Sequence, residues 1–383
     1  MDKIINKRFD EVFDLSLGRT PSRGVGAYWG GSHTWVSIAD MSCGKYISES
    51  KEYITDKALS DTGIPVVKKG TVIMSFKLSI GKVCITDTDL YTNEAIMAFV
   101  PKPQYKILPE FLYYYLMCYK WNNSNEVVLG FTLNKKTISQ SIVSIPSSLA
   151  EQERIVEILD REFERIDALK ANAEQNLQHA KDLFQSALKQ ELQPKEGWKS
   201  QTFSDEVDVI NGRAYRKEEL LSKGKYRVLR VGNFFTNDSW YYSDLELSDD
   251  KYCDYGDLLY AWSASFGPKI WKGEKVIYHY HIWKMVSKNG IDTHFLYYWL
   301  QSPHLTTQVM SNLHGTTMAH ITKGIMESTT IQFPEKQEQN AVVARLDKLK
   351  EHCSALEENY TKTIALCDDM KQALLRKAFN GEL

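Results

Sequence analysis

The residue types that most often carry chemistry are present in this chain, but without the spacing that a catalytic site requires. His279 and His281 place two imidazoles on one face of an expected strand, which suits a metal ion, yet no spacing marks a third ligand. The Gly-Lys pair in segment 80–83 lacks the hydroxyl residue and the upstream glycine of a phosphate-binding loop. Glu274 and Lys275 lack the intervening residue of a nuclease Glu-x-Lys motif, and the Pro-Pro-Tyr motif of amino-methyltransferases is absent. The sequence therefore predicts a protein with no catalytic or metal site of its own.

Composition indicates an ordinary folded protein with ample core. Its 383 residues are 43% hydrophobic and 25% charged, and this length allows two domains or more. No run of apolar residues is long enough to span a membrane, so we expect no membrane partner. The six cysteines form no CxxC pair, and segment 1–8 lacks the apolar core of a signal peptide. We therefore expect a reduced, cytoplasmic protein.

The net charge of −2 by itself argues against a nucleic-acid partner. The charge is unevenly distributed, however, because segment 1–150 is mildly basic and segment 151–190 is acidic. Affinity for a polyanion would have to come from local basic clusters or from a partner protein.

An internal repeat decides the expected architecture. Matching segments recur in the same order in the two halves of the chain: 17–19 with 211–213, 111–116 with 295–300, and 146–160 with 334–347. Between these anchors the two copies differ almost everywhere. The repeat therefore predicts two units that share a frame and differ in surface content.

The last anchor of each copy opens a long polar helix with an apolar stripe. In the first helix the stripe comprises Ile155, Leu159, Ile166, Leu169, Ala173, Ala180, Leu183 and Ala187. In the second it comprises Val342, Leu346, Leu349, Cys353, Leu356, Tyr360, Thr363, Cys367, Met370 and Leu374. This spacing predicts a heptad seam along which the two helices pack on each other. Ser148 with Glu151 predicts the start of the first helix, and Pro194 with Gly197 its end.

We therefore expect an α/β protein of mixed α+β type. Two globular domains are each followed by a long α-helix, and the helices form an antiparallel coiled coil with an internal pseudo-two-fold repeat. The predicted boundaries are 1–147 for the first globular domain, 148–193 for the central helix, 194–334 for the second globular domain and 335–383 for the C-terminal helix.

This arrangement resembles the specificity subunit of type I restriction-modification systems, and the resemblance covers the whole chain. Its most specific pieces are the opening of the first helix, at 146–160, and the terminal segment 372–383. Segments 17–22 and 212–215 resemble the first strand and turn of a target recognition domain. The second helix opening departs from the pattern, because Glu338 is followed by Gln-Asn-Ala where an Arg or Lys often stands.

The resemblance implies a division of labour with partner proteins. Each target recognition domain would read one half of a bipartite site in double-stranded DNA, and the helices would act as a ruler for the unread spacer. Two methyltransferase subunits, carrying S-adenosylmethionine, would dock on the helices and flip an adenine in each half-site. A restriction subunit that uses ATP can join them. The chain itself would be non-catalytic, with no cofactor of its own.

The candidate DNA contacts are arginines and polar side chains on turns, because Arg–guanine and Asn–adenine pairs read the major groove. In the first domain they are Arg19, Ser22, Arg23, Lys77, Lys82, Thr132, Asn134, Lys135 and Lys136. In the second domain they are Arg213, Tyr215, Arg216, Lys217, Arg230, Asn233, Ser263, Ser265, Lys269, His314, Thr316, Thr317, His320 and Lys323. The aromatic rings of segments 111–116 and 295–300 are suited to base stacking, but their helical spacing predicts core positions instead.

Two other functions stay open on the sequence alone. The chain could be a coiled-coil adaptor whose globular ends bind other proteins and not DNA. It could also be a nuclease or modification enzyme with a diverged site, which metal-dependent cleavage by the purified chain would reveal.

Overall fold

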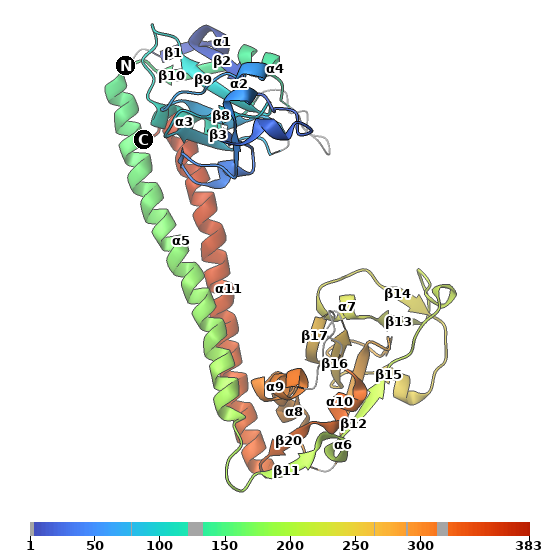
Figure 1. The fold of residues 1–383 in the computed structure, drawn as a ribbon. Coiled ribbons are helices and arrows are strands. Elements are labelled where there is room, and N and C mark those ends of the chain that lie inside the picture. The colour runs from blue at the N-terminus through green and yellow to red at the C-terminus, as the bar shows by residue number, and fades with distance from the viewer. Residues whose placement is uncertain (1–3, 78, 122–132, 264, 289, 312–320) are drawn as a thin grey trace. The chain divides into compact units, whose positions relative to one another are not determined.

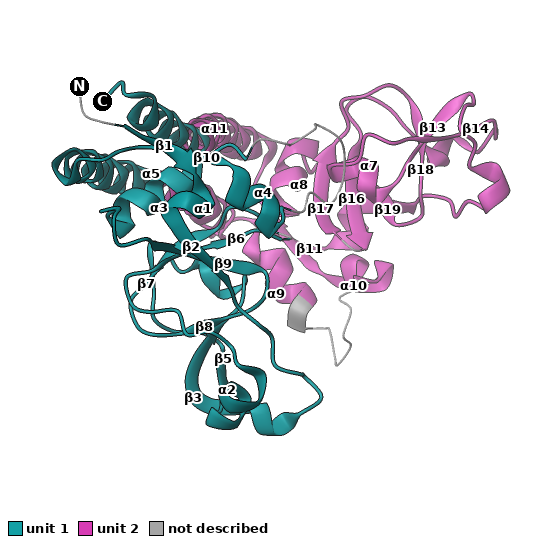
Figure 2. Ribbon diagram, turned by 90° about the horizontal axis from the view of Figure 1, so that it is seen from above, with its two compact units in different colours: residues 1–172, 363–383 teal, residues 173–362 magenta. Residues whose placement is uncertain are grey.

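The computed structural model describes residues 4–77, 79–121, 133–263, 265–288, 290–311 and 321–383. Contacts divide the chain into two compact units, coloured separately in Figure 2. The first unit comprises Met1–Asn172 and Thr363–Leu383, and the second comprises Ala173–Lys362. Each unit therefore contains a globular part and segments of both long helices (Figure 1).

The first unit is built on two sheets and a short antiparallel pair. The pair joins β1 (Ile4–Arg8) to β10 (Ile142–Pro146). The five-stranded sheet has the order β2 (Phe13–Leu17), β9 (Ile96–Pro101), β6 (Val72–Ser75), β7 (Val83–Thr86) and β4 (Tyr46–Ile47). The three-stranded sheet has the order β5 (Glu52–Ile54), β3 (Trp29–Val36) and β8 (Tyr91–Thr92). The short helices are α1 (Phe9–Val12), α2 (Asp56–Thr62), α3 (Pro109–Cys118) and α4 (Lys135–Gln140).

The second unit repeats this plan with small changes. Its short pair joins β11 (Lys199–Thr202) to β20 (Thr330–Phe333). One four-stranded sheet has the order β12 (Val207–Asn211), β19 (Ile282–Ser287), β16 (Leu258–Ser263) and β17 (Ser265–Ile270). The other has the order β14 (Tyr241–Ser243), β13 (Tyr226–Leu229), β18 (Val276–Tyr278) and β15 (Tyr252–Cys253). Its short helices are α6 (Phe203–Glu206), α7 (Val231–Phe235), α8 (Thr293–Trp299), α9 (Pro303–Ser311) and α10 (Lys323–Ser328).

The connectivity confirms the internal repeat. The run β2-β9-β6-β7 corresponds to β12-β19-β16-β17, and β5-β3-β8 corresponds to β14-β13-β18. In both units the last of these pairings, β3 with β8 and β13 with β18, is parallel. The expected α+β class with two related globular parts is therefore correct.

The central strands are apolar on both faces because each face covers a separate core. In β6, Val72 and Met74 pack in a cluster with Phe111 of α3, whereas Ile73 packs in another cluster with Val36. Side chains of a strand alternate between its faces, so the residues of β6 that reach the two cores are apolar.

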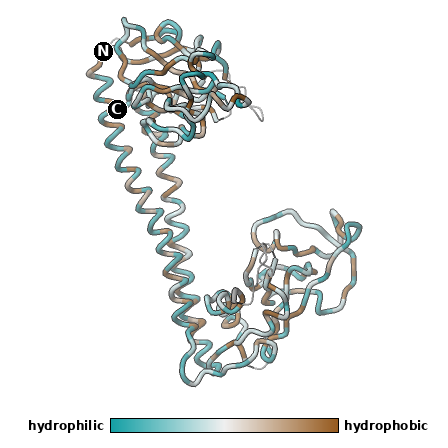
Figure 3. Tube along the Cα trace, viewed as in Figure 1, coloured by the Kyte–Doolittle hydropathy of each residue, from teal (hydrophilic) through white to brown (hydrophobic). Residues whose placement is uncertain are grey.

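The two long helices are α5 (Leu149–Glu191) and α11 (Lys336–Asn380). In the first unit Leu159 near the start of α5 shares a core with Leu375 near the end of α11. In the second unit Leu188 near the end of α5 shares a core with Leu346 near the start of α11. The helices therefore run antiparallel within each unit, as predicted, and apolar residues recur along both in Figure 3.

The predicted seam is only half correct. The seven-residue series Leu159, Ile166, Ala173 and Ala180 is buried. In contrast, the stripe residues Leu169, Leu183, Leu356 and Met370 are exposed. Two helices alone touch along a narrow line, so the second apolar position of a heptad can lie outside the contact. At the end of α5 the buried residue is Leu188, fully enclosed, whereas Leu183 is 52% exposed.

The repeated Glu-Gln dipeptide at the start of each helix has a structural explanation. The Gln152 side chain is fully buried, and its Nε2 donates to the carbonyls of Lys106 at 3.1 Å and Pro146 at 2.9 Å. Its Oε1 accepts a hydrogen bond from the backbone N–H of Leu108 at 2.9 Å. Gln339 makes the same three kinds of contact in the second unit. The glutamine thus ties each long helix to its globular part through backbone groups that would otherwise be buried without partners.

The tyrosine-rich helices α3 and α8 occupy the core, as their spacing predicted. Tyr114 is buried and its hydroxyl donates to Asp160 of α5. Tyr298 is buried and its hydroxyl donates in the same way to Asp347 of α11. Burial and these carboxylates raise the hydroxyl pKa of both tyrosines. Among the described residues, no helix combines the length and the apolar character needed to cross a membrane.

Candidate nucleic-acid interface

The repeated Gly-Arg dipeptides lie just after the first strand of each main sheet, where the backbone passes close to a second strand. A Cβ at Gly18 would lie 2.0 Å from the carbonyl oxygen of Thr92, and the next N–H, of Arg19, donates to that oxygen at 2.8 Å. A Cβ at Gly212 would lie 2.4 Å from the carbonyl oxygen of His279. Only glycine permits this approach, which brings an arginine to the junction of the two sheets in each unit.

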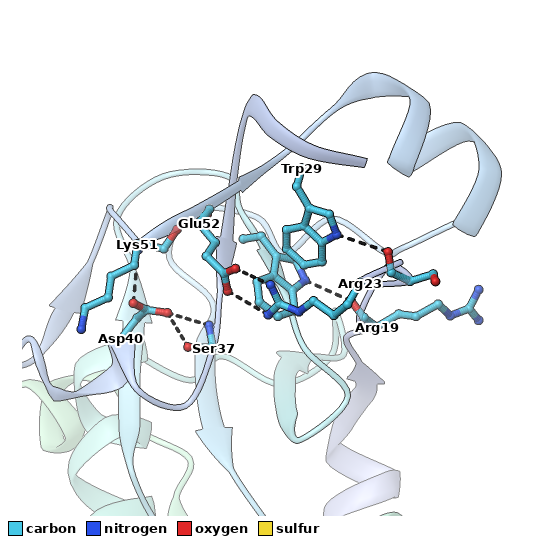
Figure 4. Close-up of polar contacts among 10 residues, drawn as sticks. Arg19, Arg23, Trp29, Ser37, Asp40, Lys51 and Glu52 are labelled. Atoms are coloured by element: carbon cyan, nitrogen blue, oxygen red, sulfur yellow. Dashed lines mark hydrogen bonds and ion pairs between the residues drawn. The ribbon is translucent and has the colours of Figure 1, made fainter. Parts of the chain in front are cut away.

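In the first unit Arg23 forms a cluster with aromatic rings and a carboxylate (Figure 4). Its guanidinium makes a two-point ion pair with Glu52, one contact being 2.9 Å. The guanidinium carbon lies 4.0 Å from the ring centre of Trp29 and 5.2 Å from that of Trp35. The hydrogen bond from Arg23 lowers the pKa of Glu52, which therefore stays ionised. Arg23 is held in place, but Glu52 occupies the fork that would read a base.

Backbone contacts fasten this cluster to the Gly-Arg turn. The indole N–H of Trp29 donates to the Ser22 carbonyl at 3.3 Å, and that of Trp35 donates to the Arg19 carbonyl at 3.0 Å. The Arg19 guanidinium donates to the carbonyl of Thr62. The exposed Ser22 hydroxyl makes no hydrogen bond with the described residues. The structure thus brings together three of the predicted residues, Arg19, Ser22 and Arg23.

Sequence reasoning missed the acidic residues of this region. Asp40 accepts hydrogen bonds from the backbone N–H groups of Ser37 at 2.9 Å and Lys51 at 3.2 Å (Figure 4). It therefore fixes the segment that leads into β5, where Glu52 lies. Asp40 and Glu52 are distant from Arg23 in sequence, so only the pairing of β3 with β5 reveals the connection.

The predicted lysines of the first unit are partly structural. The Lys82 ammonium donates to the Ile38 carbonyl at 3.2 Å and to the Ser42 hydroxyl at 2.7 Å, so it holds a loop. The Lys77 ammonium lies 5.5 Å from the ring centre of Phe76.

Three further candidates of the first unit lie at helix α4, and a fourth lies before it. Asn134 caps this helix, because its side-chain oxygen accepts from the N–H of Thr137 at 2.9 Å. Lys135 and Lys136 follow it, and both are exposed without an ion pair among the described residues. Thr132 lies outside the described residues.

In the second unit Arg213 is also paired with a carboxylate. Its two terminal nitrogens lie 2.9 and 2.7 Å from the oxygens of Glu219. This hydrogen bonding, with a further bond from the N–H of Arg216, lowers the pKa of Glu219 to about 2. The Tyr215 ring centre lies 5.2 Å from the Arg213 guanidinium. The side chains of Arg216 and Lys217 are exposed and make no hydrogen bond with the described residues.

Arg230 is held differently. Its guanidinium carbon lies 4.3 Å from the ring centre of Tyr241, and among the described residues no carboxylate pairs with it. The positive charge of Arg230 acts on the nearby His279 imidazole. Burial, aided by the charges of His281 and Arg230, lowers the pKa of His279 to about 4, so this imidazole is neutral at physiological pH.

Two other predicted residues fasten the segment that carries Arg230. The Asn233 amide donates to the carbonyls of Asn237 at 2.9 Å and Ser239 at 2.7 Å, which closes the turn before β14. The Lys269 ammonium donates to the Phe234 carbonyl at 2.6 Å, which joins β17 to α7. Arg230, Asn233 and Lys269 therefore come together, with Asn233 and Lys269 as supports.

The remaining candidates of the second unit are dispersed. Ser263 is buried and Ser265 is exposed, facing each other at the tip of the β16–β17 hairpin. Lys323 begins α10, and its ammonium lies 3.4 Å from a Glu327 oxygen. The candidates His314, Thr316, Thr317 and His320 lie outside the described residues.

The chain matches the type I restriction modification DNA specificity domain twice, over residues 1–179 and 195–366. It is 23% identical to the MjaIX type I restriction enzyme specificity subunit of Methanocaldococcus jannaschii, in an alignment that covers 98% of this chain and 93% of the relative. It is 26% identical to the EcoKI specificity subunit of Escherichia coli, over 68% of this chain and 62% of the relative.

Solved structures share the fold. A chain from work on complex assembly and conformational transition of the type I R-M system superposes with a TM-score of 0.82 at 18% identity, covering 99% of this chain and 98% of that one. The HsdS subunit of Thermoanaerobacter tengcongensis superposes with a TM-score of 0.59 at 20% identity, covering 99% and 97% of the two chains.

Proposed function

The chain belongs to the type I restriction-modification DNA specificity family, and from this premise we propose that each of its two domain copies reads one half of a bipartite site in double-stranded DNA. The observation that carries the proposal is that the two domain copies share their strand order and differ in their side chains. The strand order is repeated, whereas the side chains beside the Gly-Arg turns differ: Arg23 with Trp29 and Glu52 in one unit, Arg213 with Tyr215 and Glu219 in the other. Different side chains on one frame are what two different half-sites require.

Family membership decides between the two binding functions that the sequence left open. A coiled-coil adaptor that avoids DNA does not fit a chain that matches a DNA specificity domain along most of its length. We propose that the candidate residues contact DNA in two ways. The arginines at and near the Gly-Arg turns read bases, and the exposed Lys135, Lys136 and Lys217 contact phosphates.

The chemistry would belong to partner subunits. We propose that two methyltransferase subunits with S-adenosylmethionine dock on α5 and α11 and flip one adenine in each half-site. The apolar side chains Leu169, Leu183, Leu356 and Met370 of these helices are exposed and thus available to such a partner. A restriction subunit that uses ATP would join the same complex. The complex would act in the cytoplasm on double-stranded DNA, and the helices would set the unread spacer.

Mapping methylated adenines tests this function. In a genome that carries the chain with its methyltransferase partner, modification should occur at one bipartite sequence. Replacing residues 1–145 by the corresponding domain of another family member, with α5 retained, should change one half-site and leave the other. If both half-sites changed together, or if methylation did not depend on the chain, the proposal would be wrong.

A further inference from the structure

The arginines of the second globular part differ in what holds their guanidinium groups. Arg213 pairs with Glu219, and Arg227 lies 3.2 Å from an oxygen of Glu274. Arg230 has neither a carboxylate nor any other hydrogen-bond acceptor among the described residues. Among the described residues, no carboxylate therefore neutralises the positive charge of Arg230.

The Arg230 side chain is nevertheless held. Its guanidinium lies over the Tyr241 ring, with 4.3 Å between the guanidinium carbon and the ring centre. The Nε atom of Arg230 is fully buried and has no hydrogen-bond partner among the described residues. Its two terminal nitrogens are not fully buried. The inner part of the group is thus packed, and the two terminal nitrogens form a fork that no described residue occupies.

The backbone on both sides of this contact is fastened. Arg230 immediately precedes α7, and its carbonyl accepts a hydrogen bond from the N–H of Phe234 at 2.9 Å. Asn233 closes the turn that leads to Tyr241, and Lys269 holds α7 against β17. The arginine and the ring beneath it therefore sit on a segment with three ties, which lowers the conformational entropy lost on binding.

His279, which is close to Arg230, and Tyr215, which stacks on His279, add no charge of their own. His279, whose pKa lies at about 4, is neutral at physiological pH. The Tyr215 hydroxyl is buried, has no hydrogen-bond partner among the described residues and carries no charge, because burial raises its pKa. A preorganised, unpaired guanidinium on an aromatic ring suits the O6 and N7 acceptors on the major-groove edge of guanine.

We propose that Arg230 reads a guanine in the half-site recognised by the second domain, with Tyr241 as its positioning residue. This assignment rests on the proposed function of the chain as a DNA specificity subunit. It also distinguishes Arg230 from Arg23 of the first unit, whose guanidinium is paired with Glu52.

The test uses the full chain in complex with its methyltransferase partner. The measurement is the affinity of this complex for a duplex that carries the bipartite site found by mapping methylated adenines. The same affinity is measured for duplexes in which each base pair of the second half-site is changed in turn. We expect Arg230→Lys to lose about 5- to 150-fold of the preference for guanine at one position, because lysine cannot form the two parallel hydrogen bonds. Preference in the first half-site should not change.

Three further variants complete the test. Arg227→Lys changes an arginine that is already paired with Glu274 and should leave every base preference unchanged. Tyr241→Phe keeps the ring and should keep the preference, whereas Tyr241→Ala should lose part of it. Unchanged melting temperatures show that each variant folds.

The outcomes separate the two proposals. If Arg230→Lys keeps the wild-type preference at every position, or weakens binding equally to all sequences, the assignment of Arg230 is overturned while the bipartite recognition stands. If the wild-type complex itself shows no sequence preference, the proposed function fails first.

Discussion

At the scale of single residues, the arginines of the two domains occupy different electrostatic settings. Arg23 is stacked on two indole rings and closed by Glu52, whereas Arg230 is stacked on one phenol ring and left open. A closed arginine contributes little to non-specific attraction, because its charge is already neutralised at short range. The first domain must open the Arg23–Glu52 pair before this arginine can contact DNA.

Glu52→Gln should therefore increase non-specific DNA binding by the assembled complex. Removing the carboxylate releases one positive charge, and the slope of log affinity against log salt should steepen by about 0.9. Titrations with a non-cognate duplex at several salt concentrations measure this slope. Glu49→Gln removes an exposed charge nearby without an ion pair among the described residues, and should change the slope much less. Weaker binding by Glu52→Gln to cognate and non-cognate duplexes alike would contradict the expectation.

The buried glutamines are the second feature at this scale. Gln152→Ala would leave one N–H and two carbonyl groups without partners at the junction of α5 and the first globular part. We expect the free energy of unfolding to fall by roughly 3 kcal/mol, since each unsatisfied buried group costs about 1–3 kcal/mol and water relieves part of this. Chemical denaturation measures the change. Gln175→Ala, at an exposed position of the same helix, should cost a few tenths of a kcal/mol at most. Equal effects of the two substitutions would show that the buried amide is not a structural tie.

At the scale of elements, the long helices meet through small side chains. Ala173, Ala180, Cys353 and Cys367 are buried along the middle of α5 and α11. Small residues allow close approach of the helices, and this narrow contact leaves Leu183 and Leu356 exposed. The helical pair therefore has an internal face of small residues and an external face with apolar residues for a partner.

Ala180→Leu should destabilise the chain by about 1–3 kcal/mol, because the added atoms force the closely packed helices apart. Leu183→Gln should leave the stability of the isolated chain nearly unchanged and weaken its association with the methyltransferase partner. Thermal unfolding and analytical ultracentrifugation of the two variants measure these effects. The reverse pattern, with Leu183→Gln unfolding the chain, would show that Leu183 belongs to the core.

At the scale of the whole molecule, the two units share strand order, the helix-anchoring glutamine and the tyrosine–carboxylate hydrogen bond. They differ in the side chains around Arg23 of the first unit and Arg230 of the second. The shared features maintain the fold and the attachment of the helices. The side chains around the two arginines vary while the strand order is kept, so each domain can acquire its own base preference.

Inserting four residues in α5 between Ala173 and Ala180 tests the role of the helices as a ruler. The insertion lengthens the helix by about 6 Å and keeps the apolar stripe nearly in phase. We expect both half-site sequences to be kept, with an unread spacer changed by about one or two base pairs at roughly 3.4 Å each. Methylome sequencing measures the spacer. Substituting the exposed residues 174–176 by alanine, without a change in length, is the control. An active complex with the original spacer would show that the helices do not determine it.

The sequence alone was sufficient for the features that recur along the chain. The repeated anchors predicted two related units, the capping residues predicted where α5 begins, and the helical spacing predicted that Tyr114 and Tyr298 are buried. These features are local or periodic, and periodicity is set by backbone geometry that every copy shares. The DNA contacts predicted at Arg19, Arg23, Arg213 and Arg230, which lie next to or near the turns, stay predictions.

Only the tertiary structure decided which apolar residues of these patterns are buried and which groups pair with each arginine. A heptad pattern marks the possible contact face, but packing against the second globular part and α11 determines that Leu188 is buried and Leu183 is not. Arginine positions are visible in the sequence, but their partners come from strands brought alongside by sheet register: Glu52 reaches Arg23 through the pairing of β3 with β5, and Tyr241 lies beneath Arg230 through the pairing of β13 with β14. The charge that remains available to a ligand depends on those long-range contacts, and a linear pattern does not contain them.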